Sequence, residues 1–204
     1  MIGIVDYGLG NVQAIANIYK WLDIPATLAR SAGELAGVTH VILPGVGAFD
    51  WAMARLNASG MRATLDELAH VQRKPVLGIC VGMQMMAGGS DEGEASGLGW
   101  FDARVKLFDE SKFLGRTHLP HMGWNDVEPA HTDGLLHHLG AEARFYFLHS
   151  YYFAPNDQAD VLATTVYGER FTCAVRRGNV HGVQFHPEKS HGWGIQLLKN
   201  FAAL

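Results

Sequence analysis

The sequence predicts an α/β fold with a mostly parallel central sheet, and three observations lead to this prediction. Short apolar runs at residues 1–7, 26–30, 39–45 and 74–80 have the length and composition of buried strands. Helical patterns separate these runs, as in repeated β-α-β units. After about residue 100, short strand patterns follow one another with few helical gaps, so we expect antiparallel strands to extend the sheet.

The first half of the chain supplies the helices that this architecture needs. Asn11 stands where it can cap a helix that ends near Leu22. Its apolar positions fall on one stripe, formed by Val12, Ile15, Ala16, Tyr19 and Leu22. Residues 50–70 show helical stripes with a break at "ASG", and a further helix is predicted over 81–87, directly after the fourth strand.

The second half reads as strands up to a closing helix. The strand patterns are "RVKLF", "GWNDVEP", "RFYFLHSYYF", "VLATTVY", "FTCAVRRG" and "NVHGVQF". Residues 192–204 have the amphipathic pattern of a final helix. Because no repeat, low-complexity tract or linker interrupts the chain, we expect residues 1–204 to form a single domain.

Composition excludes several classes of function. The chain has 204 residues, a net charge of −4 and no long Lys/Arg run, so no nucleic-acid partner is expected. Its two cysteines are too few for a disulfide framework. The longest uncharged run, 75–90, is broken by Pro and Gly and is too short for a membrane span. The N-terminus lacks the features of a signal peptide, so a soluble, cytoplasmic protein without a membrane partner is expected.

The stretch "VLGICVGMQMM", residues 76–86, places Cys80 between Gly78 and Gly82. A strand that turns at once into a helix passes through a tight corner, where neighbouring side chains would clash, and glycine removes that clash. The corner residue is then exposed at the carboxyl edge of the sheet, where open α/β sheets bind ligands. The pattern is typical of a nucleophile, although a small buried core cysteine is an alternative.

The stretch "HGVQFHPEKS" offers a base and its orienting carboxylate. Pro187 favours an extended conformation at His186. Residues two apart in an extended segment share a side, so Glu188 is predicted to meet His186. A cysteine, a histidine and a carboxylate form the group set of nucleophilic catalysis, provided that the fold brings residues 80 and 186 together.

A third candidate element, "LPGVGAF" at 43–49, also follows a strand. Gly45 and Gly47 permit a close approach of the backbone to a ligand. Backbone N–H groups of such a turn can stabilise the negative charge of a tetrahedral intermediate, and the loss of one donor costs roughly 3 kcal/mol of barrier. A plain Gly-rich turn is the alternative.

Taken together, "PGVGAF", "GICVGMQ" and "HPEKS" resemble the motifs of class I (triad-type) glutamine amidotransferases. The segments "DYGLGN", "LPHMGWN", "FYFLHSYY" and "GVQFHPEKS" are similar to those of the glutaminase subunits of imidazole glycerol phosphate synthases, from histidine biosynthesis. The resemblance covers essentially the whole chain. One departure is Val81, where the family usually has Leu. Little consequence is expected, because the functional group at this position is the backbone amide and not the side chain.

The resemblance implies a flavodoxin-like three-layer sandwich and the hydrolysis of L-glutamine to glutamate and ammonia. It makes Cys80 the nucleophile, His186 the general base and acid, and Glu188 the group that orients His186. The oxyanion donors it implies are the amide of Val81 and the backbone of Gly45, Val46 and Gly47. The glutamine-binding positions it implies are Gln84, Glu92, His149, Ser150 and Tyr151.

The resemblance also implies a partner, because nothing in this chain resembles a site that uses ammonia. The partner is a (β/α)8-barrel cyclase subunit, which forms a heterodimer with the glutaminase, receives the ammonia internally and makes imidazole glycerol phosphate and aminoimidazole carboxamide ribotide. Trp124, Tyr146 and Lys189 match positions at the interface or the ammonia passage. Core packing of the two aromatic residues and a solvated surface lysine are the alternatives. No cofactor is expected.

Three other functions compete with this interpretation. His186, Glu188 and His191, with Cys80, could be read as a metal site, but their spacing fits no standard signature, so no metal is expected. A binding scaffold without catalysis is the second, although all three triad residue types are present. Another cysteine-dependent amide hydrolase or amidotransferase subunit on the same fold is the third, and such a hydrolase leaves "LPHMGWN" and "HPEKS" unexplained.

Overall fold

The fold is described from a computed structural model, which covers residues 1–113, 115, 117–140 and 142–204. Within these residues the strands form an eleven-stranded mixed sheet and a separate two-stranded sheet. The strands are β1 Ile2–Val5, β2 Ala26–Ala29, β3 His40–Gly45, β4 Val76–Cys80, β5 Gly89–Ser90, β6 Ala103–Leu107, β7 His121–Asp126, β8 Glu128–Pro129, β9 Arg144–His149, β10 Tyr151–Pro155, β11 Val161–Tyr167, β12 Glu169–Arg177 and β13 Val180–Val183.

Five parallel strands form one side of the large sheet, in the order β2-β1-β3-β4-β13. Strands β1, β4 and β13 are buried along their whole length, which fits a parallel sheet covered on both faces. Strand β2, at the edge, is only partly buried. This strand order is that of flavodoxin-like folds, so the predicted fold class is confirmed.

The antiparallel extension differs from the prediction in two respects. Strands β12, β10 and β6 continue the sheet beyond β13 through antiparallel pairs, with β11 and β8 beside β12. However, β13 itself runs parallel to β4, and β7 and β9 pair only with each other in the second sheet. Alternating strand patterns reveal strands but not their partners, and this is why the assignment of all late strands to one antiparallel extension was wrong.

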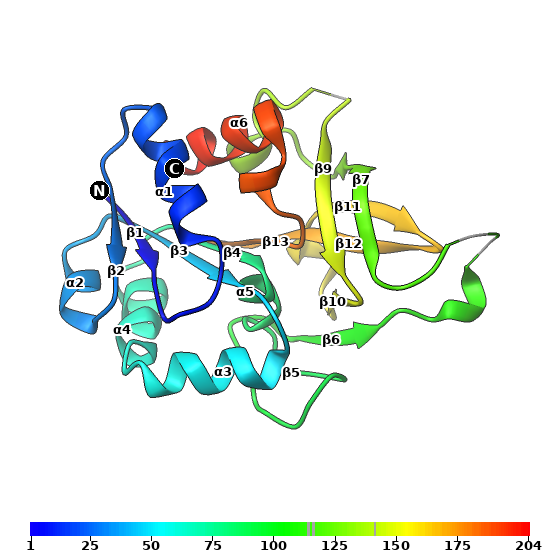
Figure 1. Cartoon of the computed structure of the whole chain (residues 1–204), viewed down its shortest axis with the longest axis horizontal. Coiled ribbons are helices and arrows are strands. Elements are labelled where there is room, and N and C mark those ends of the chain that lie inside the picture. Colours follow the sequence, from blue (N-terminus) through cyan, green and yellow to red (C-terminus); the bar gives the residue numbers. More distant parts are fainter. Residues whose placement is uncertain (114, 116, 141) are drawn as a thin grey trace.

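Helices cover both faces of the parallel strands. Figure 1 shows α1 and α6 on one face and α3 and α4 on the other. The α-helices are α1 Val12–Trp21, α2 Ala32–Ala36, α3 Phe49–Ala58, α4 Arg62–Asp66, α5 Val81–Gln84 and α6 His191–Phe201. A π-helical turn, η1 Glu67–Val71, follows α4, and the 3-10 turns are η2 Glu110–Lys112, η3 Gly134–Leu136, η4 Gln158–Asp160 and η5 Pro187–Lys189.

Two helices differ from their predictions. The short α2 was missed, because five residues give too little periodicity to detect. Helix α5 spans only Val81–Gln84 rather than 81–87, and the chain then turns into the loop before β5. The break predicted at "ASG" separates α3 from α4. In the described part of the chain, no helix has both the length and the apolar character to cross a bilayer.

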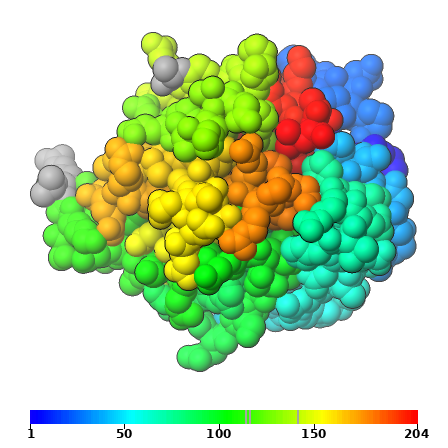
Figure 2. Space-filling model, turned by 180° about the vertical axis from the view of Figure 1, so that it is seen from behind, coloured from blue at the N-terminus to red at the C-terminus, as the bar shows by residue number. Residues whose placement is uncertain are grey.

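The core lies between the large sheet and its helices. Met83, Met85 and Met86 are buried in it, and so is Cys173 on β12. The hydroxyl of Tyr19 on α1 donates to the carbonyl of Leu198 on α6, 3.0 Å away, and so joins the first and last helices. Figure 2 shows the other side of the molecule, where yellow and orange segments from the antiparallel half lie at the surface beside the green and teal ones.

The topology brings three chain segments to one rim. Strands β3, β4 and β13 are neighbours and run in the same direction, so they end at the same edge of the sheet. Gly45 at the end of β3 lies in register with Cys80 at the end of β4. The chain leaves β13 at Val183, three residues before His186. Segments more than a hundred positions apart in sequence therefore meet at this edge.

Candidate active site

Cys80 stands at a strained corner between β4 and α5. Its backbone has φ 54° and ψ −114°, a conformation that is uncommon for a residue with a side chain. A Cβ on Gly82 would lie 1.8 Å from the carbonyl oxygen of Leu43, and one on Gly78 would lie 2.8 Å from the carbonyl oxygen of Gly82. Both positions therefore require glycine because other backbone atoms approach closely. This is the reason for the two glycines that the sequence pattern suggested.

His186 is held in a defined orientation by its own neighbours. Its backbone is extended, with φ −104° and ψ 95°, and Pro187 follows. The ring Nδ1 donates to Oε1 of Glu188 at 2.9 Å, and both side chains are almost fully buried. The backbone N–H of His186 donates to the carbonyl of Tyr146, and the hydroxyl of Ser190 donates to the carbonyl of His186. Because Nδ1 is engaged by Glu188, the opposite ring nitrogen is available to Cys80.

Cys80 and His186 line the same pocket. Burial alone would lower the pKa of His186, but hydrogen bonds and charge interactions with Cys80 and Glu188 raise it to about 10. The sulfur also lies 4.0 Å from the carbonyl oxygen of Leu148, and Nε2 of Gln184 lies 3.8 Å from it. The structure thus brings together the three residues predicted as nucleophile, base and orienting carboxylate.

The 45–47 segment lies against the start of α5. A Cβ on Gly45 would lie 2.5 Å from the backbone nitrogen of Gly82, so the two backbones are in close contact. Gly47 has φ +83°, a conformation that favours glycine. The hydroxyl of Tyr7 donates to the carbonyl of Pro44 at 2.8 Å and fixes the start of the segment. The predicted oxyanion residues are therefore adjacent, with Val46, Gly47 and Val81 facing one pocket.

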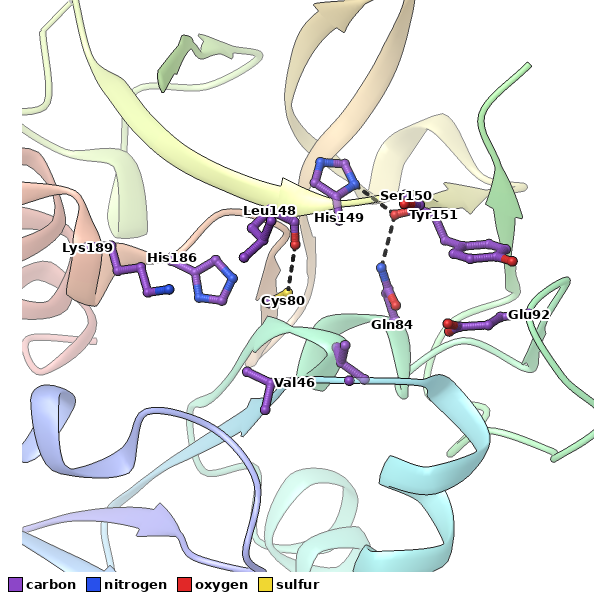
Figure 3. A pocket seen from close by; sticks show the side chains of 12 residues that line it. Val46, Cys80, Gln84, Glu92, Leu148, His149, Ser150, Tyr151, His186 and Lys189 are labelled. Atoms are coloured by element: carbon purple, nitrogen blue, oxygen red, sulfur yellow. Dashed lines mark hydrogen bonds between the residues drawn. The ribbon is translucent and has the colours of Figure 1, made fainter. Parts of the chain in front are cut away.

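The pocket has a volume of about 240 Å³, below the roughly 300–1,000 Å³ that is typical of drug-sized ligands. Figure 3 shows Cys80 and His186 on one side and Gln84 and Glu92 on the other. The pocket is lined by Val46, Gly47, Cys80, Val81, Gln84, Glu92, Leu148, His149, Ser150, Tyr151, His186 and Lys189. All five residues predicted to hold glutamine thus line the cavity that contains the thiol.

A buried amide network supports the floor of the pocket. Nε2 of Gln84 donates to the carbonyl of Tyr151 and to Oε1 of Gln184, each at 3.0 Å. Gln184 in turn lies beside the Cys80 sulfur, so a chain of amides connects the β10 side of the pocket with the thiol. Such fully bonded networks hold their members in one arrangement.

A second polar chain runs from the pocket to β7. Nδ1 of His149 donates to the carbonyl of Tyr151 at 2.8 Å, so its Nε2 accepts from Nδ1 of His121, 3.1 Å away. Nε2 of His121 is then the acceptor for the side-chain amide of Asn125, at 3.3 Å. Each ring is thereby fixed in one tautomer. The ring of His121 also stacks on Tyr167 and Phe147, inside an aromatic cluster.

Acid should destabilise the protein through three buried histidines. Burial lowers the pKa of His121 to about 4, of His149 to about 3 and of His181 to about 4. Below pH 6.5 these histidines therefore bind protons in the unfolded chain but remain neutral in the folded chain. This stability is complete above pH 6.5 and is lost as the pH falls towards 4, at about 1.4 kcal/mol per pH unit for each histidine.

Urea unfolding between pH 7 and 5 measures this effect. His181→Leu, which lies outside the pocket, is expected to reduce the slope of unfolding free energy against pH by about one third, because one of three equivalent groups is removed. A wild-type stability that does not change over this interval would contradict the assignment.

The residues predicted for the interface lie beside the mouth of the pocket. Trp124 and Tyr146 are cross-strand partners on β7 and β9, and their rings are 6.3 Å apart. Trp124 is 39 % exposed and Tyr146 is half-buried, which argues against core packing. Nζ of Lys189 lies 5.7 Å from the centre of the Tyr146 ring, a cation-π contact at the edge of the pocket.

The metal interpretation gains no support from the placement of the side chains. Among the described residues, no three His, Cys, Asp or Glu side chains are grouped as metal ligands. His191, which that interpretation requires, has its ring 5.3 Å from Trp124. Glu188 is engaged by the Nδ1 of His186 instead.

Two contributors to the site were missed in the sequence. Leu148 lines the pocket and presents its carbonyl to the thiol, and a main-chain group carries no signal in residue type. Gln184 is buried between Gln84 and Cys80. A signal for it existed, because a glutamine inside the apolar pattern "HGVQF" needs buried hydrogen-bond partners.

Comparison with known proteins identifies the family of the chain. The family model of class-I glutamine amidotransferases matches residues 4–203. The imidazole glycerol phosphate synthase subunit HisH of Bdellovibrio bacteriovorus is 58 % identical over 204 residues, covering 100 % of both chains. The protein of the same name from Leptospira borgpetersenii is 48 % identical, again over 100 % of both.

Solved structures support the fold at lower identity. A crystal structure described as a glutamine amidotransferase matches with a TM-score of 0.76 and 21 % identity, covering 100 % of this chain and 99 % of that one. A chain of the PurLQS structure from Thermotoga maritima matches with a TM-score of 0.72 and 17 % identity, covering 98 % and 96 %. The chain therefore belongs to the class-I glutamine amidotransferase family and, within it, to the imidazole glycerol phosphate synthase HisH subunits.

Proposed function

We propose that this chain hydrolyses L-glutamine with a Cys80–His186–Glu188 triad and delivers the ammonia to a cyclase subunit. The observation that carries the proposal is that His186, hydrogen-bonded to Glu188, faces the same small polar pocket as the thiol of Cys80. A cysteine that served only for packing would need neither the strained corner nor the oriented imidazole.

In the first step, His186 already holds the proton of the Cys80 thiol, because its raised pKa favours the charged ring, and the thiolate attacks the carboxamide carbon of glutamine. Glu188 accepts from Nδ1, keeps the other ring nitrogen directed at the sulfur and stabilises the charged ring. His186 then returns this proton to the nitrogen of the leaving group, and ammonia departs. The thioester that remains is hydrolysed by water, with His186 as the base once more.

Backbone amides of Val81 and the 45–47 segment are the proposed oxyanion donors. The close contact of Gly45 with Gly82 places both segments next to the Cys80 corner, where the oxygen of the substrate carbonyl becomes negative. Val81 begins α5, so its N–H has no partner within the helix.

The remaining pocket residues suit the amino-acid end of glutamine. We assign the carboxylate of Glu92 to the ammonium group, and Figure 3 shows it on the far side of the pocket from His186. Gln84 and the 149–151 segment form the wall between these ends. A site that pairs with both charged groups would reject amides that lack them, because its own polar groups would remain unpaired.

The partner that we propose is a (β/α)8-barrel cyclase that contacts the exposed face of the β7–β9 sheet. Met122, Trp124 and Leu148 expose 63 %, 39 % and 37 % of their surface on this sheet, next to the pocket mouth and Lys189. Apolar surface of this kind on a monomer marks an interaction site. We further propose that residues 1–204 act as one domain and that the heterodimer works in the cytoplasm.

Co-purification with a cyclase subunit of imidazole glycerol phosphate synthase, followed by a glutaminase assay, tests the function. We expect a stable pair and release of glutamate from glutamine, with higher activity when the cyclase holds its own ligand. A pair that forms but releases no glutamate under either condition would contradict the proposed activity.

A further inference from the structure

We propose that Asp50 is a positioning residue that sets the preference of the site for amides bearing an α-amino group. It acts through Glu92, so the inference rests on the proposed function and adds a determinant outside the pocket. Asp50 lies on the first turn of α3 and is not among the residues that line the cavity.

Asp50 holds the turn that follows Glu92. Its Oδ2 accepts from the backbone N–H of Glu94 at 2.9 Å, and its Oδ1 accepts from that of Ala95 at 3.0 Å. Gly93 lies so close that a Cβ there would be 2.1 Å from Oδ1. Both oxygens of one carboxylate are therefore committed to two successive amides, an arrangement that fixes position as well as contributing energy.

Glu92 completes the connection from the opposite direction. Its Oε2 accepts from the backbone N–H of Phe49 at 2.9 Å, the residue next to Asp50. Its own N–H donates to the hydroxyl of Ser90. The turn and the start of α3 are thus joined by an exchange of hydrogen bonds. Asp50 of the helix binds the backbone of the turn, and Glu92 of the turn binds the backbone of the helix. This exchange fixes Glu92 at the wall of the pocket, where a substrate ammonium group would lie.

The exchange also ties substrate recognition to the 45–47 segment. Only Ala48 separates Gly47 from Phe49, whose N–H is bonded to Glu92. Without Asp50 the turn loses two of its anchors, and Glu92 is held less firmly, by its bonds to Phe49 and Ser90 alone. The predicted loss is therefore in selectivity for the ammonium group, and the reaction at Cys80 is left intact.

Steady-state kinetics of the complex with the cyclase subunit test this inference. The two substrates are L-glutamine and glutaramate, which is glutamine without its α-amino group. For Asp50→Ala we expect the ratio of kcat/KM for glutamine to kcat/KM for glutaramate to fall about tenfold. The fall should come from a higher KM for glutamine, while kcat stays within about a factor of two of the wild-type value. Asp50→Asn keeps one acceptor and should give an intermediate ratio.

Two controls separate positioning from other effects. Asp91→Asn removes the same charge from the same turn and breaks only an exposed ion pair with Arg104, so its ratio should equal that of the wild type. Asp66→Ala removes the acceptor of the hydrogen bond from the Trp100 indole and should lower Tm without changing the ratio. An unchanged ratio in both Asp50 variants, or an equal fall in Asp91→Asn, would overturn the inference. A wild-type complex that hydrolyses neither amide would instead overturn the proposed function.

Discussion

Cys80→Ser is expected to reduce glutamine hydrolysis by about 10⁵-fold or more, since a serine hydroxyl stays protonated where the thiol ionises and is a far weaker nucleophile. The serine hydroxyl would occupy the same strained corner, with φ 54° and the same flanking glycines, so the fold should persist. Release of glutamate from glutamine by the complex measures the loss, and thermal unfolding confirms that the variant is folded.

Synthesis from added ammonium salts is the matching control for this variant. Because the cyclase would use ammonia from either source, the Cys80→Ser complex should still form product when ammonium salts replace glutamine. His186→Ala should behave in the same way, and Glu188→Gln should retain more activity, because Glu188 orients the imidazole without exchanging atoms with the substrate. Persistent use of glutamine by Cys80→Ser would show that the nucleophile is assigned wrongly.

Gly82→Ala should produce the largest structural effect of any single methyl group in the site. The new Cβ would lie 1.8 Å from the carbonyl oxygen of Leu43 and 2.9 Å from its carbonyl carbon, and these are backbone atoms of β3. The strand and the corner must separate, at a cost of roughly 3 kcal/mol or more of unfolding free energy. Urea unfolding measures this cost, and the glutaminase assay should show nearly complete loss of activity.

Gly33→Ala provides the matched control for that substitution. Gly33 lies within α2, and an added Cβ would meet nothing within 4 Å. Alanine in a helix is more stable than glycine by about 0.5–1 kcal/mol, so this variant should be slightly more stable than the wild type and fully active. If Gly82→Ala were as stable and active as Gly33→Ala, the corner could not be as tight as described.

The sequence was informative where a residue type is dictated by its local backbone. Glycine on both sides of Cys80 indicated a corner. Pro187 indicated the extended backbone of His186, but Glu188 reaches the ring from the 3-10 turn Pro187–Lys189 and not from an extended segment as predicted. Continuous apolar runs indicated the parallel strands, because strands buried on both faces have no polar alternation. The joining of Cys80 and His186 then depended on β3, β4 and β13 being neighbours, which only the fold class supplied.

Other parts of the site depend on pairings that no local pattern encodes. The separate β7–β9 sheet and the His121–His149 bond arise from strand register. The carbonyl of Leu148 near the thiol is a main-chain group, and the residue type at a position does not indicate where its main-chain carbonyl points. Asp50 resembles an ordinary acidic residue in the first turn of a helix, and its bonds to the turn after Glu92 become visible only in three dimensions.

The most direct test of the convergence of Cys80, His186 and Glu188 is covalent labelling with a diazoketone analogue of L-glutamine, located by peptide mass spectrometry. The account predicts a single modification on Cys80 that glutamine suppresses and that His186→Ala slows strongly, because the imidazole activates the sulfur. Labelling that is equally fast in His186→Ala, or that falls on the buried Cys173 instead, would contradict it.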